Sequence, residues 1–242
     1  MIHLPAWRGR HVGSDGRHLR QTFDHALQQV EDDLLRMGTL AGQLLTRAVD
    51  ALARSDAAAA ASVIEDDDKV DRLHLDIERR IMSLLATQQP MAGDLRTLAS
   101  VLAASIDLER FADHAEGIAD ATVRLNSQRL VKPVVEIPYM AQIVQGMLHD
   151  VLHASARRDP VLAEALAAKD DTVDALRVQT LRVLLTYMAE NPRTITQALE
   201  LILVTQHLER AGDLVTNIAE RVIYMVTGEM RELNIEAVGG LR

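Results

Sequence analysis

The sequence predicts an all-α protein in which two pseudo-symmetric three-helix bundles together contain six long helices. Three observations lead to this prediction. Aliphatic residues recur at helical spacing, aromatic residues make up only 2% of the chain, and a segment near residue 110 returns about one hundred positions later. The 48% apolar content is mainly Ala, Leu, Val, Ile and Met, which suit helix interiors and interdigitating cores.

The first bundle is expected over residues 18–130, after a mobile arm at residues 1–17. Its apolar residues recur every three or four positions, as on the buried face of a helix. Pro and Gly near residue 90 interrupt this pattern, and Asp56 suits the cap of a helix. The three helices are expected from His18 to Arg54, from the Ser55-Asp56 cap to Thr87, and from Asp94 to Gln128.

The second bundle is expected over residues 138–228, before a frayed tail at residues 229–242. The segment 131–138 contains two prolines and separates the halves. Two Asx-Pro pairs supply helix starts, because the Asx side chain caps and Pro suits the first helical position. The helices are expected from Tyr139 to Arg157, from Asp159-Pro160 to Glu190, and from Asn191-Pro192 to Thr227, where Gly228 ends the last one.

The composition disfavours several classes of protein. A formal charge of −9 argues against nucleic acid as the main partner, because phosphate contacts need a basic surface. The absence of cysteine excludes disulfides, thiolate metal sites and cysteine nucleophiles. The sequence contains no long apolar run and no signal-peptide pattern, so we expect a cytoplasmic protein without membrane insertion. Motifs of serine hydrolases, phosphate-binding loops and zinc proteases are missing.

One segment occurs twice and preserves charged residues. The pattern Leu-Glu-Arg-x-x-Asp at residues 108–113 returns at residues 208–213. A repeated core helix needs to preserve only its apolar residues, so repeated acidic residues need another reason, and cation binding is the first to consider. Arg110 and Arg210 are also repeated and suit bidentate bonds to the carboxylates. A phosphate-binding role for them is less favoured, because neither lies in a Gly-rich loop or a basic cluster.

Acidic residues form stripes on two helices of the first half. Positions i, i+4, i+7 and i+11 lie near one face of a helix. Like charges at this spacing repel by about 0.2–0.5 kcal/mol per pair unless cations or arginines neutralise them. The stripe of the second helix comprises Asp67, Asp71, His74 and Glu78, and that of the third comprises Glu109, Asp113, Glu116 and Asp120.

The second half repeats these stripes in a thinner form. Asp170 and Asp174 match the pair on the second helix at an offset of 103, and Glu209 and Asp213 match the pair on the third at an offset of 100. Glu220 persists, and Asn217 offers an amide oxygen beside the position of a lost glutamate. The replaced residues are Glu116 by Thr216, His74 by Arg177 and Glu78 by Leu181, which puts a full cluster in the second half in question.

Helices that fold back at a turn bring residues equidistant from the turn to one height. With turns near Met91 and Pro192, each half places an Asp-x-x-x-Asp pair level with a Glu-x-x-x-Asp pair. Clustered carboxylates suit Mg, Ca, Mn, Fe or Zn ions. The predicted metal ligands are Glu109, Asp113, Asp67, Asp71, Glu209, Asp213, Asp170 and Asp174, with Glu116, Asp120, Asn217, Glu220, His74 and Glu78 as a second tier.

Two other classes of function compete with a metal-binding regulator. Acidic residues on a helix usually form a solvated face, so a metal-free helical scaffold is one alternative. A carboxylate-bridged metalloenzyme on a helical bundle is the other. Its chemistry usually needs histidine support, and the Glu-x-x-His pairs of ferritin-like di-iron proteins are absent.

The chain resembles the PhoU family over roughly residues 20–230. The segments that carry the resemblance are Phe23-Asp24 leading to Met37-Gly38, Gln88-Gln89-Pro90, Asp94-Leu95-Arg96, residues 107–115 and residues 207–220. The resemblance implies two three-helix bundles and a cytoplasmic, non-enzymatic regulator of phosphate homeostasis. It implies partnership with the ATPase of the phosphate-specific ABC transporter and with a phosphate-sensing histidine kinase, a homodimer, and multinuclear Mg, Mn, Fe or Zn clusters at the paired motifs.

Overall fold

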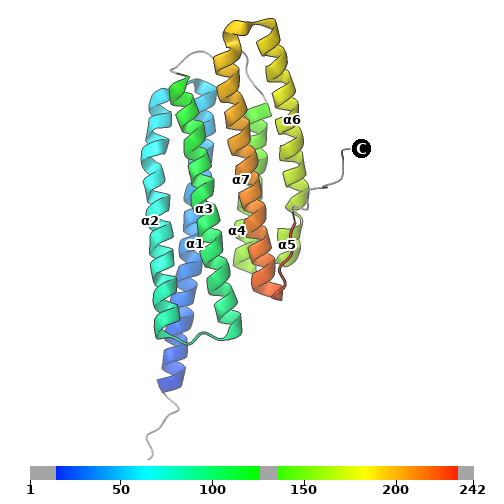
Figure 1. Cartoon of the computed structure of the whole chain (residues 1–242). Coiled ribbons are helices and arrows are strands. Elements are labelled where there is room, and N and C mark those ends of the chain that lie inside the picture. Colours follow the sequence, from blue (N-terminus) through cyan, green and yellow to red (C-terminus); the bar gives the residue numbers. More distant parts are fainter. Residues whose placement is uncertain (1–14, 126–135, 234–242) are drawn as a thin grey trace, which may run out of the picture.

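The computed structural model describes residues 15–125 and 136–233, and this part of the chain is helical without any strand (Figure 1). The predicted all-α fold with six long helices is confirmed. Residues 1–14, 126–135 and 234–242 lie outside the described residues, and with them most of the arm expected at 1–17 and of the tail expected at 229–242. Residues 15–17 of the expected arm belong instead to the first turn of the first helix. The elements are α1 (Asp15–Arg54), α2 (Ala57–Thr87), α3 (Ala92–Arg124), α4 (Glu136–Arg157), α5 (Pro160–Glu164), α6 (Ala167–Glu190), the 3-10 helix η1 (Pro192–Thr194) and α7 (Ile195–Thr227).

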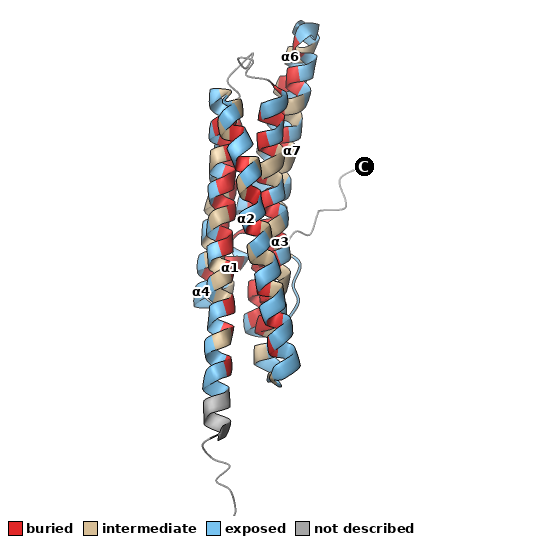
Figure 2. Ribbon diagram, turned by 90° about the vertical axis from the view of Figure 1, so that its left-hand side faces the viewer, coloured by how far each residue is buried: buried red, intermediate tan, exposed pale blue. Residues whose placement is uncertain are grey.

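The six long helices form two layers. Helices α2, α3, α7 and α6 lie side by side in one layer, and α1 and α4 lie behind them (Figure 1). Helices α1, α2 and α3 pack together as one bundle, and α4, α6 and α7 as the other. Contacts of α3 with α7 and of α1 with α4 join the bundles, so the buried faces meet in one continuous core (Figure 2).

The two halves repeat each other in the backbone as well as in the sequence. Ser55 and Arg158 follow α1 and α4, and both have φ of 53°. The next residues, Asp56 and Asp159, place their carboxylates on the first backbone N–H groups of α2 and α5. Their own N–H groups donate to the carbonyls of Ala51 and Ala154 over 2.9 Å in each case. The caps predicted at Asp56 and Asp159 are therefore present, at equivalent points of the two bundles.

One helix that was predicted to be continuous is interrupted in the structure. The helix expected from Asp159-Pro160 to Glu190 is divided into α5 and α6 by a turn at residues 165–166. The turn places Leu166 in the core, where it is 1% exposed. Its carbonyl accepts from the N–H groups of both Lys169 and Asp170, which starts α6. The burial of one leucine therefore decides a break that helical periodicity does not reveal.

Helices α3 and α7 run antiparallel along their whole length. Arg124 pairs with Glu200 near one end, with 3.0 Å between Nη2 and Oε2. Arg96 lies beside Gly228 at the other end. Because equivalent residues of these helices are 100 positions apart, Ala112 and Gly212 lie level at the centre. The pseudo-twofold axis passes there, and the two copies of the repeated segment meet across it.

A histidine pair occupies this central contact. The Nδ1 atoms of His114 and His207 are 3.2 Å apart, and one ring must donate while the other accepts. Gly117 makes room for the second ring, since a Cβ there would lie 2.3 Å from Cε1 of His207. Burial first, and then the charge of His207, Arg210 and Arg110, lower the pKa of His114 to about 4. Both rings are therefore neutral near pH 7.

None of the described helices combines the length and the apolar character that crossing a membrane requires.

The substitution Gly117→Ala should weaken the α3–α7 contact. Its Cβ would collide with the His207 ring, so we expect a loss of about 1–3 kcal/mol in the free energy of unfolding, measured by urea denaturation. The same change at Gly146, where nothing lies within 4 Å, should be neutral or stabilising. A Gly117→Ala, His207→Ala double variant should recover much of the loss, and a loss that persists unchanged would contradict this account.

Candidate metal centre

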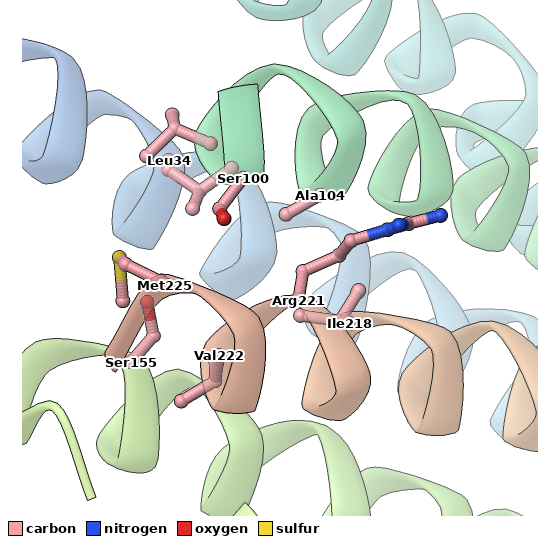
Figure 3. Close-up of a pocket in the computed structure, with 9 residues that line it drawn as sticks. Leu34, Ser100, Ala104, Ser155, Ile218, Arg221, Val222 and Met225 are labelled. Carbon is pink, nitrogen blue, oxygen red and sulfur yellow. The ribbon is translucent and has the colours of Figure 1, made fainter. Parts of the chain in front are cut away.

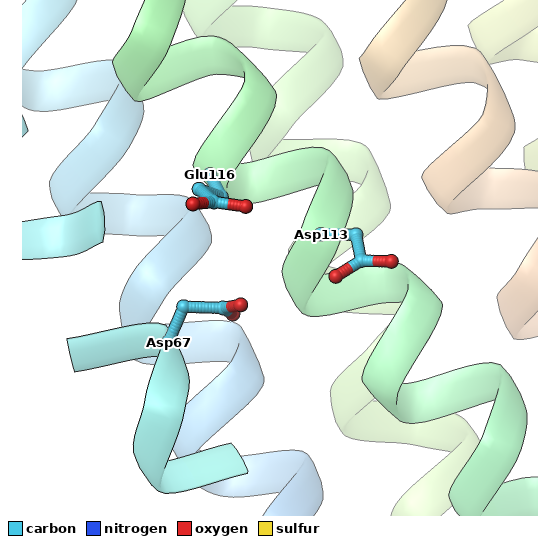
Figure 4. Close-up of side chains that lie close together, drawn as sticks. All are labelled: Asp67, Asp113 and Glu116. Carbon is cyan, nitrogen blue, oxygen red and sulfur yellow. The ribbon is translucent and has the colours of Figure 1, made fainter. Parts of the chain in front are cut away.

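Three carboxylates of the first half converge between α2 and α3. Oxygen atoms of Asp67, Asp113 and Glu116 all lie within 4.8 Å of one another (Figure 4). Asp67 comes from α2, and the other two come from successive turns of α3. This is the only group of three or more His, Asp or Glu ligand atoms at such spacing in the described part of the chain. It combines two predicted ligands with a residue expected in the second tier.

Asp67 is the most unusual of the three. Asp67 is 7% exposed, and its Oδ1 atom is buried without a hydrogen-bond partner among the described residues. Burial, and then the charges of Glu116, Asp71, Asp113 and Glu109, raise the pKa of Asp67 to about 7. A buried carboxylate oxygen without a donor is costly. A cation at this point would supply the missing partner and relieve the repulsion.

The surrounding carboxylates share this strained electrostatic environment. Burial is the first cause that raises the pKa of Glu109, Asp113 and Glu116, and neighbouring carboxylates raise each further. The charge of Asp71 contributes to the raised pKa of all three residues. Asp71 therefore belongs to the same cluster of charges, although it lies outside the group of three converging carboxylates. We call Asp67, Asp71, Glu109, Asp113 and Glu116 together the first acidic site.

His74 lies beside the first acidic site with its ring oriented by a hydroxyl. Its Nδ1 is 3.2 Å from Oγ of Ser105, and that hydroxyl donates to the carbonyl of Leu102. The Ser105 proton is thus used, so Nδ1 of His74 donates and Nε2 keeps its lone pair. An imidazole fixed in this tautomer is suited to bind a metal through Nε2. Two other second-tier residues of the first half lie outside the group of three carboxylates. Asp120 is exposed, with its Oδ2 atom 4.0 Å from Nη1 of Arg124, and Glu78 is half-buried.

The equivalent carboxylates of the second half have a different arrangement. Asp170 is 4% exposed and lies against Gly212, where a Cβ would be 2.7 Å from its Oδ1. Arg177, which replaces His74, forms an ion pair with Glu209, with 3.4 Å between Nε and Oε1. We call Asp170, Asp174, Glu209 and Asp213 the second acidic site. Its charge is partly neutralised by an arginine of the protein itself, so it has less need of a bound cation.

The remaining predicted ligands of the second half are not brought together as a ligand group. Buried Thr216 donates to the carbonyl of Gly212, and Glu220 accepts from the N–H of Leu233 over 2.7 Å. Asn217 is half-buried, and Asp174 is exposed. The expected bracing by the repeated arginines is also not seen: the ion pair at Glu209 comes from Arg177, and neither Arg110 nor Arg210 forms one within 4.0 Å among the described residues.

Two features of the central contact were not predicted. The His114 ring faces α7 and pairs with His207, a contact that the spacing of the acidic stripe does not reveal. Asp107 is the second feature. It is 8% exposed, and its pKa is raised to about 6 by burial, against the opposing charges of Arg221 and Arg110. Its spacing of seven residues from His114 marks the face of α3 that meets α7, and that signal was available in the sequence.

A small pocket between the bundles lies away from these carboxylates. Its lining comes from α1, α3, α4 and α7: Leu34, Ser100, Val101, Ala104, Ser155, Ile218, Arg221, Val222 and Met225 (Figure 3). The Ser100 hydroxyl has no hydrogen-bond partner among the described residues. The space suits about one water molecule, which could join this hydroxyl to its surroundings. It is too small for a substrate, so the first acidic site remains the candidate functional centre.

The donor atoms of the first acidic site suit hard or borderline cations. Its ligand atoms are carboxylate oxygens with one imidazole nearby, a set that fits Mg, Mn, Fe or Zn. The orphaned Asp67 oxygen fits such an ion particularly well.

Comparison with known proteins places the chain in a family. Residues 34–122 and 137–222 match the PhoU domain. A relative from Aquifex aeolicus, named phosphate-specific transport system accessory protein PhoU homolog, is 38% identical over 204 residues, or 84% of this chain and 92% of that protein. A relative of the same name from Pseudomonas aeruginosa is 39% identical over 212 residues, or 87% of this chain and 88% of that protein.

Solved structures agree with the sequence relatives. The crystal structure of PhoU from Pseudomonas aeruginosa superimposes with a TM-score of 0.82 at 38% identity, covering 86% of this chain and 100% of that one. The phosphate transport system regulatory protein PhoU from Streptococcus pneumoniae gives a TM-score of 0.81 at 30% identity, covering 86% and 99%. The resemblance found in the sequence is thereby confirmed, and the chain belongs to the PhoU family.

Proposed function

We propose that this protein is a non-enzymatic, metal-binding regulator of phosphate homeostasis. It couples the phosphate-specific ABC transporter, through its ATPase, to a phosphate-sensing histidine kinase, and it restrains phosphate uptake and the starvation response when phosphate is plentiful. The names of its relatives, accessory or regulatory proteins of phosphate transport, support the regulatory role. We also propose that it acts in the cytoplasm as a homodimer.

One observation carries the metal-binding part of this proposal. Asp67 has a buried oxygen without a donor and faces two carboxylates of α3. Asp67, Asp113 and Glu116 would hold the first ion, and Asp71, Glu109 and His74 lie where a second could be shared. A bound divalent or trivalent cation would neutralise the converging charges and tie α2 to α3. The second acidic site would bind less strongly, because Arg177 already pairs with Glu209.

The names of the relatives, which describe accessory or regulatory proteins, support a non-enzymatic role. Metal-assisted hydrolysis or oxygen chemistry needs an open coordination position and a pocket that shapes a substrate. The three carboxylates converge between α2 and α3, and Asp113 is exposed to solvent. The metal therefore acts as a structural and regulatory ion in this proposal.

Equivalent residues of the two halves offer a matched test of metal binding. Asp113→Asn should lower the affinity of chelator-treated protein for Mn²⁺ by about tenfold or more, measured by isothermal titration calorimetry, because it removes a charged ligand. Asp213→Asn, at the same position of the repeat, should change it by less than about twofold. Equal losses in both variants, or no Mn²⁺ binding by the unaltered protein, would reject the assignment.

The pH dependence of stability offers a second test. The folded-state pKa of Asp67 is about 7, above its ordinary value of 3.8, so the metal-free fold favours the protonated carboxyl. Stability from this group is present below about pH 4 and is lost as the pH rises through about 7. Asp67→Asn should therefore raise the free energy of unfolding of metal-free protein at pH 8 by about 1–3 kcal/mol and flatten its pH profile between 4 and 7. An unchanged profile in urea denaturation would show that Asp67 is not strained.

The regulatory part predicts a cellular phenotype and a direct contact. Cells that lack the protein should express phosphate-starvation genes in phosphate-rich medium, and the unaltered gene should restore repression. The purified protein should bind the transporter ATPase or the cytoplasmic part of the kinase in surface plasmon resonance. An unchanged phosphate response together with the absence of both contacts would contradict the proposal.

A further inference from the structure

Each half of the protein exposes a row of large apolar side chains on the hairpin of its last two long helices. On α2 and α3 these are Leu75, Met82, Leu85, Leu95 and Ile106, which we call the first apolar patch. On α6 and α7 they are Val178, Leu185, Ile195, Leu199 and Leu203, which we call the second apolar patch. Most of the exposed large apolar side chains of the described residues belong to these two sets.

Three pairs of residues occupy equivalent positions in the two patches. Leu75 and Met82 correspond to Val178 and Leu185 at an offset of 103, and all four are 38–51% exposed. Leu95 corresponds to Ile195 at an offset of 100, and these two are 48% and 40% exposed. Single apolar residues on a surface are ordinary. Their retention at the same exposed positions of both halves indicates a shared role in binding.

Each patch continues the helix face that carries an acidic site. Leu75 and Met82 follow Asp71 by four and eleven residues, and Val178 and Leu185 follow Asp174 by the same intervals. Ile106 precedes Asp113 by seven residues. The apolar rows therefore extend from the acidic sites toward the α2–α3 and α6–α7 turns, along the layer of four helices seen in Figure 1.

The pseudo-twofold axis relates the patches and sets their separation. The middle of the first patch on α3, near residue 100, is twelve residues from Ala112 at the axis. A helix rises 1.5 Å per residue, so each patch centre is about 18 Å from the axis and the two are about 36 Å apart along the helices. They diverge toward opposite ends of one face, because α3 and α7 are antiparallel.

We propose that the two apolar patches together form a docking surface for a twofold-symmetric protein partner that presents the same amphipathic helix twice. The pseudo-twofold axis supplies the reason for two equal copies. The chain's charge of −9 supplies the chemistry, with exposed Asp113 beside the first patch and exposed Asp174 beside the second: the partner helix has an apolar face with Lys or Arg at its edge. A second copy of this chain fits poorly, because a chain of charge −9 would place acidic sites against acidic sites.

A bivalent model peptide tests this inference without relying on metal binding. The probe carries two copies of an 18-residue Leu/Lys amphipathic helix joined by a Gly/Ser linker of about 40 residues, whose r.m.s. length is about 35 Å. A control probe is a single copy of the helix without a linker, so it can occupy only one patch at a time. With EDTA present, the long-linker probe should bind the full-length protein with a Kd about 100-fold or more below that of the control probe.

Charge substitutions identify where the probe binds. Met82→Glu in the first patch and Leu185→Glu in the second are at exposed positions, so folding should be preserved. Either one should bring the affinity of the long-linker probe down to that of the control probe, and the two together should abolish binding. Val161→Glu should have no effect, because this residue is 75% exposed on α5, outside both patches.

Three results would overturn the proposal. The first is an equal Kd for the two probes, which would exclude simultaneous use of both patches. The second is a loss with Val161→Glu as large as with Met82→Glu, which would indicate general attraction to a basic peptide. The third is a change of oligomeric state in sedimentation velocity. If the unaltered protein is a dimer and the Met82→Glu, Leu185→Glu variant is a monomer, the surface binds a second copy of the chain.

Discussion

The antiparallel contact between α3 and α7 is the constraint on which the other features depend. Each of these helices carries one copy of the repeated segment, and the copies cross at Ala112 and Gly212 on the pseudo-twofold axis. Near the crossing, Gly117 leaves space for the His207 ring between the two helices. The crossing sets both acidic sites at one height and on one face. It also directs the apolar rows to opposite ends of the molecule.

The two halves show how one scaffold can meet the same electrostatic problem in two ways. Both helix pairs bring carboxylates together around one buried aspartate, Asp67 or Asp170, and such charges need a partner. In the first half no Lys or Arg of the described residues forms an ion pair with these carboxylates, and Asp67 is left with a buried oxygen without a donor. In the second half Arg177 occupies the position of His74 and pairs with Glu209. The first half therefore has a place for a bound cation, whereas the second half is partly neutralised by its own arginine.

The sequence predicted the fold well, because its signals are local and repeated. The caps at Asp56 and Asp159 and the stop at Gly228, with φ of 78°, each depend on one side chain and its neighbours. The break between α5 and α6 depends on where Leu166 enters the core, which only the assembled bundle decides. The same holds for His114, whose ring is directed by a helix from the other half.

The grouping of the carboxylates in the first half follows from counting residues along the two helices. Asp67, 24 residues before Met91, is level with Ala115, 24 residues after it, and therefore with the interval between Asp113 and Glu116. As a result Glu116, expected in the second tier, joins Asp67 and Asp113 in the group of three converging carboxylates, while Asp71 and Glu109 lie beside it. The difference between the two acidic sites was visible in the sequence as three replacements. The ion pair that neutralises the second site needed the structure.

The central claim is that a cation belongs to the first acidic site and not equally to the second. Crystals soaked in Mn²⁺ and measured at the manganese absorption edge test it most directly, because anomalous scattering locates the ion without assumptions about ligands. We expect the strongest peak between Asp67, Asp113 and Glu116, and a weaker peak or none near Asp170 and Glu209. No peak at the first site, or a peak of equal height at the second, would contradict the account.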